Sequence, residues 1–125
     1  MLGVFDRRLT EDIFHTLVKE GKRSIAPLAK ALGSEDPHIK IRAAWAIGEI
    51  KEIDSRAVTS LVNLLRGESN LAAEAAWALG EMGAISSVRA LIPLALSGES
   101  RAREAAEAAL LKIIDKCPNH LVLAG

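Results

Sequence analysis

Two tryptophans occupy equivalent places in two nearly identical segments of the chain. Trp45 lies in the segment AAWAIGEI, and Trp77 lies 32 positions later in the segment AAWALGEM. Tryptophan is enriched among the residues that dominate binding energy at protein–protein interfaces. Indoles at two equivalent positions either form an aromatic ridge for a partner or pack as core between neighbouring elements. The sequence leaves both arrangements open.

Charged residues accompany both tryptophans at helical spacing. Arg42 and Glu49 surround the first, and Glu74 and Glu81 surround the second. Paired carboxylates can serve acid–base catalysis, but helices one repeat apart would hold Glu49 and Glu81 about 9–10 Å from each other. No histidine or third carboxylate lies at helical spacing to complete a catalytic site. We therefore predict no catalytic residue. The two carboxylates either recognise basic side chains of a partner, which we favour, or are simply solvated. The predicted binding surface consists of Trp45, Trp77, Glu49, Glu81, Arg42 and Glu74.

Other kinds of site lack the residues that they need. The single cysteine, Cys117, excludes an intramolecular disulfide and a cysteine-based zinc cluster. The three histidines, His15, His38 and His120, are not part of a metal-ligand motif. A phosphate-binding loop and a nucleophile elbow are also missing. We expect a protein without metal or cofactor that is not an enzyme.

A second set of equivalent residues precedes each tryptophan segment. Arg23, Arg56 and Arg89 are spaced 33 positions apart. They can form a positive stripe along one edge of the molecule. We favour the simpler interpretation that each arginine pairs with a nearby acid, such as Asp54 for Arg56. Exposed ion pairs of this kind are common and contribute little free energy, so they do not by themselves indicate a function.

The repeats that carry these residues have helical periodicity, and no segment alternates as a strand does. Short polar breaks separate them, and Asp36-Pro37 is typical of a helix start. The pattern predicts an N-terminal helix near residues 10–20 and three helix pairs, at 24–32 with 37–51, 56–66 with 71–82, and 87–97 with 101–115.

Small residues flank the apolar stripe of the second helix in the first two units. Gly48 and Gly80 lie at equivalent positions, next to alanines. A wide arc of small and apolar residues predicts that each such helix has neighbours on more than one side, as in a solenoid. The third unit has Glu104 and Glu107 on this arc, so we expect its helix to close the array.

We therefore predict an all-α fold, an α-solenoid of about three helix pairs plus an N-terminal helix. The chain of 125 residues is expected to be a single domain. Its predicted parts are an N-terminal cap helix at 1–22, repeats at 23–54, 55–86 and 87–116, and a tail at 117–125.

The second helix of the first unit resembles the HEAT-like repeat of phycobilin lyases. That family has the pattern Asp-x-x-Val-Arg, then alanines, then Ala-Leu-Gly-x-Ile. The matching residues here are Asp36, Ile39, Lys40, Ala43, Ala44, Ala46, Ile47, Gly48 and Ile50. The resemblance implies a HEAT-like superhelix over residues 23–115. It also implies an alternative function, as an accessory subunit of a lyase-type enzyme that handles a bilin or another substrate.

Charge and hydropathy narrow the kinds of partner. The 16 basic and 16 acidic side chains balance and form no basic block, so nucleic-acid binding is not expected. Apolar residues are dispersed, and the N-terminus carries charges where a signal peptide needs its apolar core. We expect a cytoplasmic protein that does not enter a membrane.

The segment 88–96 is apolar almost all round. Either the tail, through Leu121, Val122 and Leu123, covers it, or it forms a homodimer or partner surface. We predict that the protein is a non-catalytic scaffold or adaptor. The concave face of its solenoid would bind another protein or a peptide.

Overall fold

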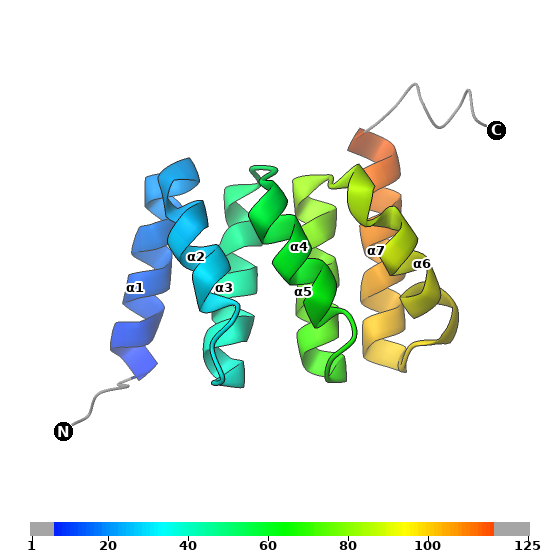
Figure 1. The fold of residues 1–125 in the computed structure, drawn as a ribbon, viewed down its shortest axis with the longest axis horizontal. Helices are drawn as coiled ribbons and strands as arrows, with labels where there is room; N and C mark the ends of the chain where they lie inside the picture. The colour runs from blue at the N-terminus through cyan, green and yellow to red at the C-terminus, as the bar shows by residue number, and fades with distance from the viewer. Residues whose placement is uncertain (1–6, 117–125) are drawn as a thin grey trace.

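The computed structural model describes residues 7–116, and this part of the chain is helical throughout apart from short connections (Figure 1). Two 3-10 turns, at Gly21–Ser24 and Ile85–Ser87, precede α2 and α6. The all-α prediction is confirmed, and the helices begin and end close to the predicted residues. They are α1 (Arg7–Glu20), α2 (Ile25–Ala31), α3 (Pro37–Ile50), α4 (Ser55–Leu64), α5 (Ser69–Met82), α6 (Val88–Ser97) and α7 (Ser100–Lys116).

The helices stack in two layers, as an α-solenoid does (Figure 1). We call α1, α3, α5 and α7 the inner layer, and α2, α4 and α6 the outer layer. The core runs between the layers along the whole array, so each repeat contributes a few large side chains instead of one central cluster. The fully buried large apolar residues are Ile25, Leu28, Ile47, Leu61, Leu79, Leu91 and Ile113.

Glycines allow the inner helices to approach each other closely. A Cβ atom added at Gly48 would lie 3.1 Å from the Cα of Ala78, and one added at Gly80 would lie 2.7 Å from the Cα of Ala109. Ala78 and Ala109 are repeat-equivalent, so the α3–α5 and α5–α7 packings use the same contact. A side chain at either glycine would force the helix axes apart.

The outer layer is packed less tightly than the inner one. The contact between α5 and α7 is the most extensive between any two helices of residues 7–116, whereas α4 and α6 hardly touch. Close spacing on one side and wide spacing on the other bend a stack of helices toward the closely packed side. The solvent-facing surface of α1, α3, α5 and α7, which we call the inner face, is therefore the concave one.

Aspartates cap the starts of two helices, and the one at Asp36 confirms the predicted helix start. Asp36 accepts a hydrogen bond of 2.9 Å from the backbone N–H of His38, just before Pro37 at the first helical position. Asp54 accepts hydrogen bonds from the backbone amides of Arg56 and Ala57. These side chains satisfy amides that a helix start leaves without partners.

Replacing Asp54 with alanine should lower the free energy of unfolding by about 1 kcal/mol at neutral pH, because α4 loses its cap. The hydrogen bond from the Arg56 side chain is the main cause that lowers the pKa of Asp54 below its ordinary 3.8. A lowered pKa means that the stabilisation is complete above pH 3.8 and is lost as the pH falls through the folded-state pKa. Thermal melts of wild type and Asp54→Ala should therefore converge in acid.

The matched control for this experiment is Asp12→Ala, since Asp12 is exposed and its side chain caps no helix. We expect that variant to melt within a degree or two of wild type at both pH values. A gap between the Asp54→Ala and wild-type melts that persists unchanged in acid would contradict the assigned role of the carboxylate.

The predicted apolar segment 88–96 forms most of α6, and its residues differ widely in exposure. Leu91 is fully buried, whereas Ile92 is 43% and Leu96 79% exposed. The tail at 117–125, which was one of its predicted covers, lies outside the described residues. Among the helices of residues 7–116, we find none with both the length and the apolar character needed to cross a membrane.

Candidate functional site on the inner face

Trp45 lies at the boundary between α1 and α3, where it is half-buried. Its ring contacts His15 of α1 edge-on, with centroids 5.1 Å apart, and the guanidinium carbon of Arg42 lies 4.6 Å from the ring centroid. Arg42 also forms an ion pair with Glu11 of α1. A cation over an indole face is attracted by the ring quadrupole. This cluster therefore joins the first two inner helices.

Trp77 occupies the equivalent position between α3 and α5 and is also half-buried. Its six-membered ring lies against Gly48, because a Cβ added there would collide with Cζ3 of the ring and lie 3.0 Å from Cε3. Each tryptophan thus packs toward the preceding inner helix, while part of the ring stays accessible. Each indole is therefore partly inter-repeat packing and partly accessible to solvent, and its predicted role as part of a binding ridge stays a prediction.

A hollow opens on the other side of Trp77, toward α7. It has a volume of about 280 Å³ and is lined by Ala73, Glu74, Trp77, Arg101 and Ala105. A smaller apolar recess of about 60 Å³ adjoins the same ring and is lined by Ala105, Ala108, Ala109 and Lys112. Ala108 is the repeat equivalent of the tryptophans, so a third indole is missing where this recess lies.

Glu74 carries the negative charge of this hollow, and Arg101 carries the positive one. Glu74 is partly buried, and within residues 7–116 it makes neither a hydrogen bond nor an ion pair within 4 Å. Burial raises the pKa of Glu74 above its ordinary 4.5, and the more distant charges of Arg101 and Arg42 only partly oppose this. A partly desolvated carboxylate beside an indole is suited to receive a cationic group.

Replacing Glu74 with glutamine should stabilise the protein at neutral pH. A carboxyl whose pKa is raised by folding binds its proton more tightly in the folded state, so folding stability falls as the pH rises above about 4.5. Glutamine does not ionise and removes this loss. Thermal melts should show Glu74→Gln above wild type at pH 7 and equal to it at pH 3.5. Equal melting temperatures at pH 7 would contradict the desolvation of Glu74.

Glu81 is held within the structure by lysines from both neighbouring helices. Its side chain is 11% exposed and forms ion pairs with Lys51, at 3.1 Å, and with Lys112 of α7. Lys51 ends α3 in the left-handed conformation, with φ of 63°, at the position where the next repeat has Gly83. Glu81 therefore links three inner helices, and its repeat equivalent Glu49 is exposed.

The structure thus divides the six predicted binding residues. Arg42 and Trp45 lie at the α1–α3 boundary, and Glu74 and Trp77 line the hollow toward α7. Glu81 bridges helices, and Glu49 is exposed. Four further residues at these sites, Glu11, His15, Arg101 and Lys112, were not among the predicted binding residues. Only Lys112 carried a signal, because it occupies the repeat position of Glu49 and Glu81 with the opposite charge. The α1 residues belong to no aligned repeat.

Within residues 7–116, we find no group of three or more His, Cys, Asp or Glu side chains placed to hold a metal ion. His15 contacts Trp45, and His38 lies at the start of α3. Cys117 and His120 lie outside the described residues.

The stacked helix pairs, with their tightly packed inner layer, define an α-solenoid of repeated units. Residues 39–67 and 71–97 match the PBS lyase HEAT-like repeat. These two stretches therefore belong to that repeat family. Each match begins in an inner helix and ends in or just after the following outer helix, α3 with α4 and α5 with α6. A search of curated proteins found no match to this chain.

Proposed function

We propose that this repeat scaffold is a non-catalytic adaptor that binds a partner protein through its inner face. The observation that carries the proposal is the hollow beside Trp77, where the partly buried Glu74 lacks a close partner within residues 7–116. A lysine or arginine of the partner would meet the Glu74 carboxylate and the indole together. An aliphatic side chain of the partner would fill the recess at Ala108.

Two variants test this surface without removing its packing. Ala108→Trp places an indole where the recess lies, in the manner of the preceding repeats, and Glu74→Gln removes the charge. The matched controls are Ala26→Trp on the exposed outer face of α2 and Glu104→Gln on the exposed side of α7. Each variant would be used as bait for cross-linked affinity capture from the native host.

We expect partners that wild type and both controls capture to be lost with Ala108→Trp and Glu74→Gln. Both tryptophans of the chain lie on the inner face and it has no tyrosine, so intrinsic fluorescence reports binding directly. In a Trp45→Phe background, the recovered partner should shift Trp77 emission. Ala108→Trp should weaken its affinity by about tenfold or more.

Unchanged capture by both inner-face variants would overturn the proposal. An absorbance shift on mixing the purified protein with a bilin would contradict the non-catalytic adaptor and favour the lyase-type accessory subunit. Glu74→Gln is informative in a second way, because we expect it to raise stability while lowering affinity. That combination is typical of a residue kept for function at some loss of stability.

A further inference from the structure

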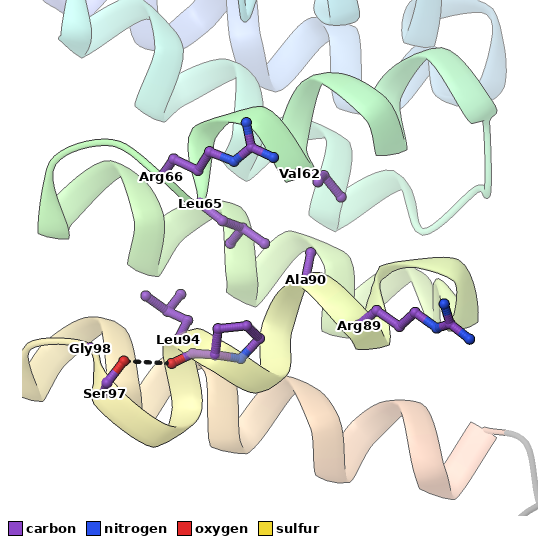
Figure 2. A pocket seen from close by; sticks show the side chains of 9 residues that line it. Val62, Leu65, Arg66, Arg89, Ala90, Leu94, Ser97 and Gly98 are labelled. Carbon is purple, nitrogen blue, oxygen red and sulfur yellow. Dashed lines mark hydrogen bonds between the residues drawn. The ribbon is translucent and has the colours of Figure 1, made fainter.

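The outer layer has a groove between α4 and α6 (Figure 2). This layer lies on the opposite side of the molecule from the inner face (Figure 1). The part between α4 and α6, which we call the main part, has a volume of about 410 Å³, and a larger hollow of about 510 Å³ continues it toward the start of α5 and α7. Volumes of this size lie in the range of ligand-binding clefts. The apolar side chains of its main part are Val62, Leu65, Ala90, Pro93 and Leu94.

The groove exists because α6 lacks two large side chains that α4 has. In the 33-residue register of the outer helices, Leu64 and Leu65 of α4 correspond to Ser97 and Gly98 at the end of α6. Leu65 is buried, whereas Ser97 only donates a hydrogen bond to the carbonyl of Pro93. α2 and α4 are in closer contact than α4 and α6. Apolar surface of Leu65 and Leu94 therefore remains on the walls.

Two arginines line the main part of the groove, and it has no acidic residue of its own. Arg66 extends from the end of α4 and Arg89 from the start of α6 (Figure 2). Neither forms an ion pair with another residue in the part of the chain that the structure describes. Glu68 and Glu99 line only the adjoining hollow. The charge of the main groove is therefore positive.

Comparison with the preceding repeat explains why Arg89 is free of an acid. Arg56, its equivalent, pairs with Asp54 at 3.0 Å, which confirms the predicted pairing for that arginine. The residue equivalent to Asp54 in the next repeat is Ser87, which is buried and donates its hydrogen bond to the carbonyl of Ala84. The residue two positions before the arginine therefore decides its environment. Asp54 pairs with Arg56, whereas Ser87 leaves Arg89 without an acid at the groove.

We propose that the α4–α6 groove binds an acidic peptide segment of a partner protein that carries leucine-type side chains. Aliphatic groups would cover Leu65 and Leu94, and carboxylates would pair with Arg66 and Arg89. Residues 117–125 of this chain contain no aspartate or glutamate, so they do not match the charge of the groove. The surface is separate from the inner face, so the proposal does not depend on the proposed function.

Labelled amphipathic peptides of equal length test the proposal by fluorescence anisotropy with the full-length chain. One peptide combines glutamate with leucine, and the others replace glutamate by glutamine or lysine, or leucine by alanine. We expect the glutamate–leucine peptide to bind best. Arg66→Glu and Arg89→Glu should each weaken the affinity for this peptide by about tenfold. Arg23→Glu, at the exposed equivalent position before α2, is the matched control and should leave binding unchanged.

A groove-filling variant separates loss of binding from loss of folding. Ser97→Leu restores the side chain that α4 has at this position, and it should abolish peptide binding while raising the melting temperature by roughly 2–6 °C. Gly98 is not suitable for filling, since a Cβ there would lie 2.6 Å from the carbonyl oxygen of Leu94.

Four results would overturn the proposal. The first is equal binding of the lysine and glutamate peptides, and the second is no binding of the glutamate–leucine peptide at ~1 mM. The third is a wild-type dimer that Arg66→Glu converts to a monomer, since a second copy of the chain would then be the occupant. Amide chemical-shift changes should centre on Leu65 and Leu94; changes centred on Trp77 would place the peptide on the inner face instead.

Discussion

Replacing Gly80 with leucine is expected to lower the free energy of unfolding by about 3 kcal/mol. The first added atom would lie 2.7 Å from the Cα and 2.9 Å from the Cβ of Ala109. Those atoms belong to the α7 helix itself, so no side-chain rotation relieves the collision, and the most extensive helix contact in residues 7–116 must open. Leucine is otherwise a better helix former than glycine by roughly 0.5–1 kcal/mol.

The sign of the change in the free energy of unfolding shows which effect dominates at Gly80, because helix propensity favours leucine and close packing opposes it. Urea unfolding followed by circular dichroism measures it. Gly67→Leu is the control, since Gly67 is exposed and the nearest atom to an added Cβ is a carbonyl oxygen at 3.4 Å. We expect that variant to stay within about 0.5 kcal/mol of wild type. If Gly80→Leu were equally harmless, α5 and α7 would not be packed as described.

The second large effect concerns Trp77 and Gly48, whose contact a double-mutant cycle should detect. Trp77→Ala alone should lower the free energy of unfolding by roughly 2–3 kcal/mol, less than for a fully buried tryptophan. Gly48→Ala alone should destabilise as well, because its methyl group meets the indole and lies 3.1 Å from the Cα of Ala78. In the double variant the indole is gone, so the penalty of the added methyl group should shrink.

We expect a coupling free energy of about 1–2 kcal/mol between Trp77 and Gly48 from the four unfolding curves. The control cycle combines Gly48→Ala with Trp45→Ala. Trp45 packs on His15 and Arg42 instead, so those two changes should be additive. Additivity in the Trp77 cycle would show that this indole does not rest on Gly48. The result also bears on the binding experiments, which for this reason keep Trp77 and block the recess at Ala108.

The positions of the helices and of the inner-layer contacts were predictable because they depend on spacing within one repeat. A period near 32 residues, with glycine and alanine recurring at the same place, specifies helices that must stack closely. Gly48 and Gly80 could be recognised for this reason. The shared position of Trp45 and Trp77 followed from the same comparison.

The partners of the charged side chains on the inner face were not predictable, because they come from different repeats or from the unaligned α1. Glu81 looked equivalent to Glu49, yet Lys51 and Lys112 hold it while Glu49 stays exposed. Glu74 is perturbed by burial in a hollow that only the packing of α5 on α7 creates. A one-repeat pattern contains no information on such contacts.

The sequence alone therefore determined the architecture, since local periodicity and small residues at repeated positions allow one way of stacking helices. The tertiary structure decided which repeated residues are available to a partner. Neighbouring helices cover Glu81 and part of each indole, and the absence of two leucines at the end of α6 opens the groove beside Arg66 and Arg89. Whether a repeated residue is accessible to a partner depends on the side chains that the adjacent repeat packs against it.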